Sequence, residues 1–212
     1  MILLLNGSGK PTNSNSEFFL KIVKEQLGEE TKYIQIMPDF DMEQIVRDLE
    51  QTDCIVFAMP LYVDGVPAPV LQFMQQLETY MQGKDTSDIH LYAMGNCGFY
   101  EGRQNAILIH IMKNWCKKTG MKWGQGIGIG SGEMFGAMRE IPFGKGPTKN
   151  LKKGLEQFAW NIKNRKSADE IYVEPSMVSQ GMFLMVANKF WDMQAKKNGV
   201  KKNVLSHKMI RE

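Results

Sequence analysis

Cysteine, histidine and long apolar runs are scarce in this chain of 212 residues. It has three cysteines and three histidines. An odd number of cysteines without metal-type spacing favours reduced thiols over a disulfide framework or a zinc site. No apolar run reaches the roughly 18 residues that a membrane-spanning helix needs, so no integral membrane segment is expected. The scattered positions are Cys54, Cys97, Cys116, His90, His110 and His207.

Charge of one sign is not in excess either. The chain has 26 Lys and Arg against 23 Asp and Glu, a formal net charge of +3 at pH 7. This surplus is too small to predict a nucleic-acid partner. Met1 leads directly into strand-like sequence, without the basic segment and cleavage site of a secretory signal. Together with the reduced thiols, these features predict a cytoplasmic protein.

Short β-rich runs alternate with amphipathic helical patterns along most of the chain, and no internal repeat occurs. Such alternation predicts the α/β class, with a parallel sheet covered by helices on both faces. Strands are expected at residues 2–5, 32–37, 54–59, 89–94 and 123–129. Helices are expected at residues 14–27, 42–49, 67–80, 103–118 and 149–164.

A loop of small and polar residues separates the first expected strand from the first expected helix. Backbone N–H groups of such a loop, together with the positive end of the helix dipole, attract an anion. The loop fits neither the P-loop pattern nor the dinucleotide fingerprint, whose third glycine is replaced by Thr12. We therefore expect a phosphate-monoester site, the alternative being a surface turn. Side-chain donors come from Ser8, Lys10, Asn15 and Ser16.

Two further loops should meet this one, because ligands of open parallel sheets bind beyond the carboxyl ends of the strands. The loop after the third strand is apolar and carries Tyr62, which can flank a flat ring or simply cap the core. The loop after the fourth strand runs from Gly95 to Gly102, and its glycines permit close backbone approach to a ligand. Cys97 has no histidine near it in sequence, which favours a backbone contact over a nucleophile.

Taken in order, the three loops resemble those of the NADPH-dependent FMN reductase branch of the flavodoxin-like superfamily. The resemblance covers residues 1–165 and implies a flavodoxin-like three-layer sandwich with five parallel strands in the order 2-1-3-4-5. It also implies FMN as cofactor. The phosphate would contact Ser8, Lys10, Asn13, Asn15 and Ser16; the ribityl chain and ring would contact Pro60, Leu61, Tyr62 and Val63; the isoalloxazine would contact Gly95, Asn96, Cys97, Gly98 and Phe99. Lys10 stands where the family more often has arginine, which keeps the charge but loses bidentate geometry.

The resemblance implies an FMN-dependent NAD(P)H oxidoreductase that passes electrons from a nicotinamide to a small acceptor: a quinone, nitro compound, flavin or metal. No catalytic side chain is required, because the reaction takes place at the cofactor. The alternative is a single-electron carrier of the flavodoxin type. Such carriers are usually acidic around the flavin, and the slightly basic composition of this chain favours the enzyme.

The glycine-rich fifth strand, at Gly124–Gly128, is expected to have a neighbouring helix packed closely against it. Residues 131–147 are expected to form a long loop, and long loops at ligand ends are often lids. Residues 166–212 should form a C-terminal helical extension, with an amphipathic helix at 179–198. A basic amphipathic helix can lie on a membrane. Packing on protein is commoner, so we expect this helix to join a homo-oligomer, a dimer or tetramer.

Overall fold

The computed structural model describes residues 1–200 and divides the chain into two compact units. The first unit is Met1–Ser176 and the second begins at Met177. The expected division lay at residues 165 and 166. The structural division falls later because a short strand at Ile171–Val173 belongs to the sheet of the first unit.

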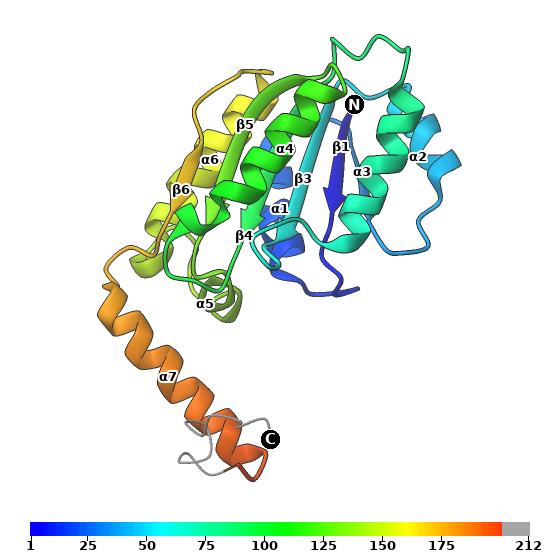
Figure 1. Cartoon of the computed structure of the whole chain (residues 1–212). Coiled ribbons are helices and arrows are strands. Elements are labelled where there is room, and N and C mark those ends of the chain that lie inside the picture. Colours follow the sequence, from blue (N-terminus) through cyan, green and yellow to red (C-terminus); the bar gives the residue numbers. More distant parts are fainter. Residues whose placement is uncertain (201–212) are drawn as a thin grey trace. The chain divides into compact units, whose positions relative to one another are not determined.

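The first unit is built on a six-stranded parallel sheet in the order β2-β1-β3-β4-β5-β6 (Figure 1). This confirms the expected order of the first five strands and adds a sixth, whose Ile171 pairs with Ile127 of β5. The sixth strand is too short for sequence periodicity to reveal. The bounds are β1 Ile2–Asn6, β2 Thr31–Gln35, β3 Cys54–Pro60, β4 His90–Asn96, β5 Lys122–Ile129 and β6 Ile171–Val173.

Helices connect the strands much as expected, with one addition. The segment expected to be a loop at residues 131–147 contains the short helix α5. The helix expected from residue 103 begins instead as a 3-10 turn, Gly102–Asn105, before α4. The α-helices of the first unit are α1 Asn15–Leu27, α2 Met42–Leu49, α3 Ala68–Met81, α4 Ala106–Lys118, α5 Gly132–Ala137 and α6 Lys149–Lys163, and a second 3-10 turn spans Gly146–Thr148.

Both faces of the sheet are buried, which explains why its central strands are apolar throughout rather than alternating. Leu3 and Leu5 of β1 point into a cluster with α3 and α4, whereas Ile2 and Leu4 point into a cluster with α1 and α6. Figure 1 shows these two helical layers on opposite faces. Each fully buried large apolar side chain contributes about 1.5–3 kcal/mol to folding. The resulting rigid sheet fixes where its carboxyl-end loops lie.

The glycines of β5 leave room for close packing, as the sequence predicted. A Cβ at Gly126 would overlap Ile109 of α4, and one at Gly128 would overlap the backbone of Gly102. Helix α4 and the 3-10 turn before it therefore pack directly against the backbone of β5, where glycines leave no side chains between them.

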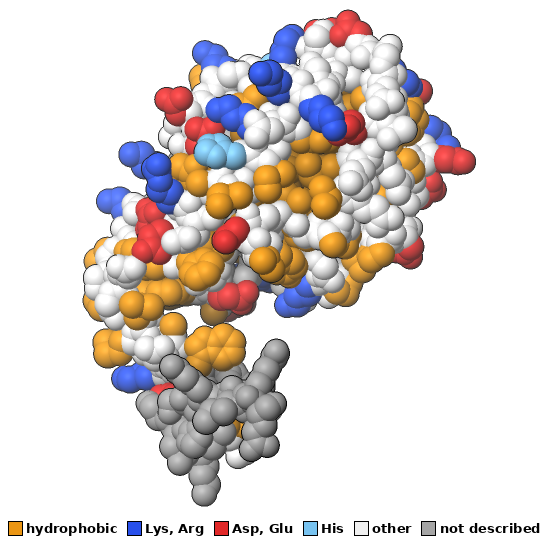
Figure 2. Space-filling model, viewed as in Figure 1, with side chains coloured by type: hydrophobic (Ala, Val, Ile, Leu, Met, Phe, Trp, Pro, Cys, Tyr) orange, Lys and Arg blue, Asp and Glu red, His pale blue; other side chains and the backbone are white. Residues whose placement is uncertain are grey.

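The second unit consists, among the described residues, mainly of helix α7, Gln180–Lys197. Ser179 begins the helix by accepting a hydrogen bond from Met182 N at 3.3 Å. No residue of α7 is buried, and its exposed apolar side chains are visible in Figure 2. Within residues 1–200, no helix combines the length and apolar character needed to cross a membrane.

Candidate functional site

Three loops at the carboxyl edge of the sheet meet around a cavity of about 210 Å³. They follow β1, β3 and β4, the strands for which convergence was predicted. Of the predicted residues, Asn13, Val63, Gly95 and Phe99 do not line the cavity. The lining residues are Ser8, Lys10, Ser14, Asn15, Ser16, Pro60, Leu61, Tyr62, Asn96, Cys97, Gly98 and Glu133.

The loop after β1 is held in shape by the fully buried side chain of Asn6. Its amide nitrogen donates to Tyr33 Oη at 2.9 Å, to Gln35 Oε1 at 2.6 Å and to Ser14 Oγ at 3.3 Å. Its carbonyl oxygen accepts from Ser8 N at 3.0 Å. Burial raises the pKa of Tyr33, so its hydroxyl remains protonated in this network. The start of the loop is thus fixed by buried polar contacts, which stabilise one conformation.

Helix α1 begins at the end of this loop and presents its amino terminus to the cavity. Ser14 caps the helix, because its Oγ accepts from Glu17 N at 3.0 Å. The hydrogen bond from Lys21 is the main factor lowering the pKa of Glu17, so this side chain stays ionised near the positive end of the helix dipole. The first helical N–H groups have no acceptor within an α-helix. The amides of Asn15 and Ser16 are therefore donors for a ligand.

Two serine hydroxyls of the cavity already accept hydrogen bonds and so keep their protons for a ligand. Ser8 Oγ accepts from Lys10 N at 3.2 Å, and Ser16 Oγ accepts from Asn96 Nδ2 at 2.8 Å. The ammonium group of Lys10 lies 3.3 Å from Asn13 O and is exposed. Asn13 itself has φ 55°, a left-handed conformation that asparagine tolerates well. We call Ser8–Ser16, with these donors, the phosphate cradle, after the ligand that the sequence predicts for this loop.

The side chain of Asn15 is engaged at both ends of its amide, which the sequence did not predict. Its Nδ2 donates to Glu133 Oε1 at 3.2 Å, and its Oδ1 accepts from an Arg139 Nη at 3.3 Å. The same Arg139 nitrogen donates to Asn13 O and Ser14 O at 3.2 and 3.1 Å. Local sequence pattern does not identify Glu133 and Arg139, because their contacts with Asn15 join segments far apart in the chain.

The loop after β3 forms a tight hairpin turn at the mouth of the cavity. Tyr62 and Gly65 exchange backbone hydrogen bonds of 3.1 and 3.0 Å, and Val63 and Asp64 between them have φ 48° and 56°. This turn leaves the Val63 side chain fully exposed and away from the cavity lining, whereas Tyr62 is half-exposed and lines it. Tyr62 is thus the aromatic group that this loop offers to a ligand.

The end of β4 is built for close backbone packing. Gly95 lies within the strand, and a Cβ there would press on the buried Asn105. Asn96 is buried and donates to Met59 O at 2.9 Å as well as to Ser16. The amide of Cys97 donates to Ile129 O at 3.0 Å. The Asn96 side-chain amide and the Cys97 backbone amide are therefore engaged within the protein, and Gly95 packs against Asn105. All three positions help to hold the end of β4 in place.

Beyond Cys97 the chain opens toward solvent. A Cβ at Gly98 would meet nothing within 4 Å, so there is space for a ligand over its backbone. The side chain of Phe99 is exposed to solvent and does not line the cavity. Burial raises the pKa of the Cys97 thiol, which keeps it protonated and weakly nucleophilic.

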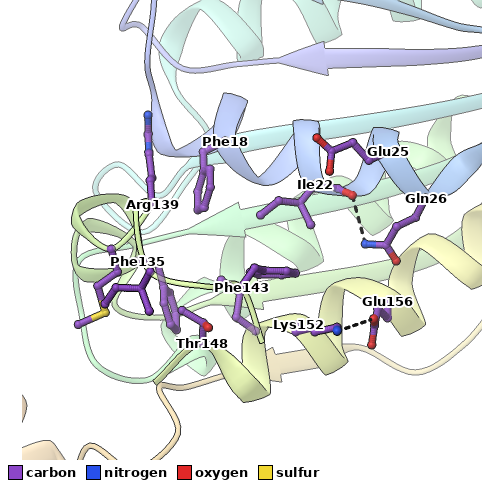
Figure 3. Close-up of a pocket in the computed structure, with 13 residues that line it drawn as sticks. Phe18, Ile22, Glu25, Gln26, Phe135, Arg139, Phe143, Thr148, Lys152 and Glu156 are labelled. Carbon is purple, nitrogen blue, oxygen red and sulfur yellow. Dashed lines mark hydrogen bonds and ion pairs between the residues drawn. The ribbon is translucent and has the colours of Figure 1, made fainter. Parts of the chain in front are cut away.

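A second and larger cavity, of about 410 Å³, lies beside the segment that contains α5 (Figure 3). Apolar side chains of α1, α5 and α6 line it, among them Phe18, Phe135 and Leu151. Arg139 belongs to its lining, yet the guanidinium points toward the start of α1, as Figure 3 shows. Donors of this cavity are engaged within the protein, since Gln26 Nε2 donates to Ile22 O and Lys152 pairs with Glu156.

Neither a protein-family model nor a curated protein matches the chain. Solved structures do match it. An NADPH-quinone reductase from P. pentosaceus has 18% identity and TM-score 0.60, covering 75% of this chain and 97% of that one. A WrbA-like flavodoxin protein from Agrobacterium tumefaciens has 11% identity and TM-score 0.55, over 77% and 94% of the two chains. A flavodoxin from Streptococcus pneumonia TIGR4 has 17% identity and TM-score 0.54, over 78% and 99%.

These similarities establish that the chain has the flavodoxin-like fold, which confirms the fold expected from the three loops. At such low identities they define the architecture and not the activity, because one fold hosts many functions.

Proposed function

We propose that this protein is an FMN-dependent NAD(P)H oxidoreductase that passes electrons from a nicotinamide to a small acceptor. The observation that carries the proposal is the phosphate cradle, whose hydroxyl protons, helix-terminal amides and lysine converge beside an exposed tyrosine. These are donors for a phosphate monoester. The cradle has no glycine pattern for a dinucleotide, which favours FMN over FAD.

The residues present fit FMN by the chemistry of their donors. Ser8, Ser16 and Lys10 would hold the phosphate, together with the amides at the start of α1. Pro60, Leu61 and Tyr62 line the part of the cavity where the ribityl chain and ring would lie. Bound FMN would supply the hydride chemistry.

The protein's own contribution is to bind, orient and exclude water. The space over Gly98 would admit the ring close to the backbone, and Tyr62 would cover part of it. We assign Cys97 no chemical role, because burial raises the pKa of its thiol and so disfavours the nucleophilic thiolate. We further propose that the protein works in the cytoplasm as a homo-oligomer, in which α7 packs across the subunit interface.

The flavodoxin-type carrier remains the second candidate, since both a reductase and a flavodoxin are among the similar structures. The balanced charge of the chain and its exposed aromatic residues, Tyr62 and Phe99, favour a small-molecule acceptor over docking to a redox protein. The two candidates differ in whether a nicotinamide reduces the bound flavin.

One experiment separates them. The purified protein is titrated with FMN and its visible spectrum recorded, and NADPH or NADH is then added without oxygen. The oxidoreductase predicts that at least one nicotinamide bleaches the bound flavin within seconds. Tight FMN binding without reduction by either nicotinamide would support the carrier instead, and no FMN binding would reject both.

A further inference from the structure

Asn15 connects the phosphate cradle to the segment after β5. Its amide is shared between the carboxylate of Glu133 and the guanidinium of Arg139. Helix α5 lies close beside it, because a Cβ at Gly136 would overlap the Asn15 side-chain oxygen. A negative and a positive side chain from one segment therefore hold the same residue of the cradle.

We propose that Glu133 and Arg139 set the charge preference of the cradle, with Arg139 favouring an anionic ligand and Glu133 opposing it. The proposal rests on the phosphate cradle of the proposed function and assigns the two residues that tune it. Arg139 acts by holding the loop and through its positive charge, and Glu133 acts by competing with the phosphate group for the amide of Asn15.

Arg139 stabilises the shape in which the cradle's amides face the cavity. One of its nitrogens donates to the backbone carbonyls of Asn13 and Ser14, the two residues just before α1. Among residues 1–200, Arg139 makes no direct ion pair with a carboxylate, and Glu133 approaches it only through the amide of Asn15. Its ring contact is with Phe18, 4.9 Å from the centroid. A nearby guanidinium lowers the energy of an anion bound at the cradle.

Glu133 has the opposite effect. Its carboxylate lines the same cavity as Ser8 and Lys10 and takes a hydrogen bond from Asn15 Nδ2. A phosphate monoester carries about −1.5 to −2 charges at neutral pH. It would repel this carboxylate and offer Asn15 a stronger acceptor. Because Glu133 is exposed, it can turn to solvent when an anion arrives. The cost of this displacement applies to a charged ligand and not to a neutral one.

FMN and riboflavin provide the test, because they differ only in the phosphate group. Their dissociation constants are measured by flavin fluorescence quenching for the wild type and for Glu133→Gln and Arg139→Gln. The substitution E133Q keeps a hydrogen-bond acceptor for Asn15 and removes only the charge. We expect E133Q to bind FMN about three- to tenfold more tightly, with unchanged riboflavin affinity. We expect R139Q to weaken FMN binding about tenfold or more, with a much smaller effect on riboflavin.

Glu140→Gln is the matched control, since Glu140 is an exposed carboxylate of the same segment that lines neither described cavity. It should leave both affinities unchanged. Equal changes in FMN and riboflavin binding, or weaker FMN binding by E133Q, would overturn the roles proposed for Glu133 and Arg139. Either result would leave the phosphate cradle itself in place. A wild type that binds FMN no more tightly than riboflavin would reject the phosphate cradle itself. If R139Q does not fold, E133Q decides the matter.

Discussion

The side-chain amide of Asn96 donates to the hydroxyl oxygen of Ser16 at 2.8 Å, joining the end of β4 to the start of α1. Asn96 is buried, and the same nitrogen donates to Met59 O of β3. Ser16 Oγ therefore acts as acceptor toward the protein and keeps its proton for the cavity. Asn96 thus orients the cradle, and because it also lines the cavity, the contact with the flavin ring that the resemblance implies stays a prediction.

Replacing Asn96 with Asp should weaken FMN binding by reversing this hydrogen bond. A carboxylate accepts where the amide donated, so the Ser16 hydroxyl would turn its proton away from the phosphate. Loss of one hydrogen bond to a charged group costs about 1.5–3 kcal/mol. FMN titration measures the effect, and riboflavin, which has no phosphate, should lose much less affinity. An equal loss for both flavins would mean that the variant damages the fold and not the orientation of Ser16.

The double substitution Ser8→Ala and Lys10→Ala should also weaken FMN binding, by a few kcal/mol at about 1.5–3 kcal/mol for each charge-assisted contact. Neither side chain is needed for folding, because Lys10 is exposed and Asn6 fixes the loop through the backbone of Ser8. Isothermal calorimetry with FMN gives the affinity. Lys84→Ala, an exposed lysine far along the chain, is the charge-matched control. A double variant with wild-type affinity would place the phosphate elsewhere.

The position of the candidate site could be predicted from the sequence because parallel strands direct their following loops to one edge of the sheet. Once five strands were recognised, the loops after β1, β3 and β4 had to meet, and they do. The expected donors Ser8, Lys10 and Ser16 line the cavity, and the sequence marks them because they stand at the junction of strand, loop and helix.

The finer contacts could not be predicted, because they depend on pairings between distant segments. The contact of Asn15 with Arg139 joins residues 124 apart in the chain. Val63 faces away because two consecutive left-handed residues reverse the chain. Strand β6 has only three residues and exists through its pairing with β5. In each case tertiary contact, and not local pattern, decides the outcome.

Gly126→Val should destabilise the protein by about 1–3 kcal/mol, the usual cost of overpacking a core. Its Cβ would overlap Ile109, which is itself fully buried against the sheet. Urea unfolding followed by circular dichroism measures the change in the free energy of unfolding. Gly9→Ala is the control, because a Cβ at Gly9 meets nothing within 4 Å. Equal stability of the two variants would contradict close packing of α4 on β5.

The last prediction concerns helix α7, whose apolar side chains include Val186 at 64% and Phe190 at 47% exposure. These two residues are four apart and so share one face of the helix. Apolar patches of this kind mark protein or membrane contact. We expect the contact to be with a second subunit, so Val186→Asp with Phe190→Asp should convert an oligomer to a monomer. Sedimentation velocity measures the change in mass.

Lys189→Glu with Lys196→Glu provides the matched control, because it alters charge on the same helix without removing apolar side chains. It should preserve the oligomer. The same variant tests the alternative that α7 binds a membrane. In that case the Lys→Glu changes should abolish binding to anionic vesicles, because the basic residues add to membrane affinity through their charge. Helix α7 would have no role in assembly if the Asp variant kept the mass of the wild type. Vesicle binding by the wild type, lost in the Glu variant, would then assign α7 to a lipid surface.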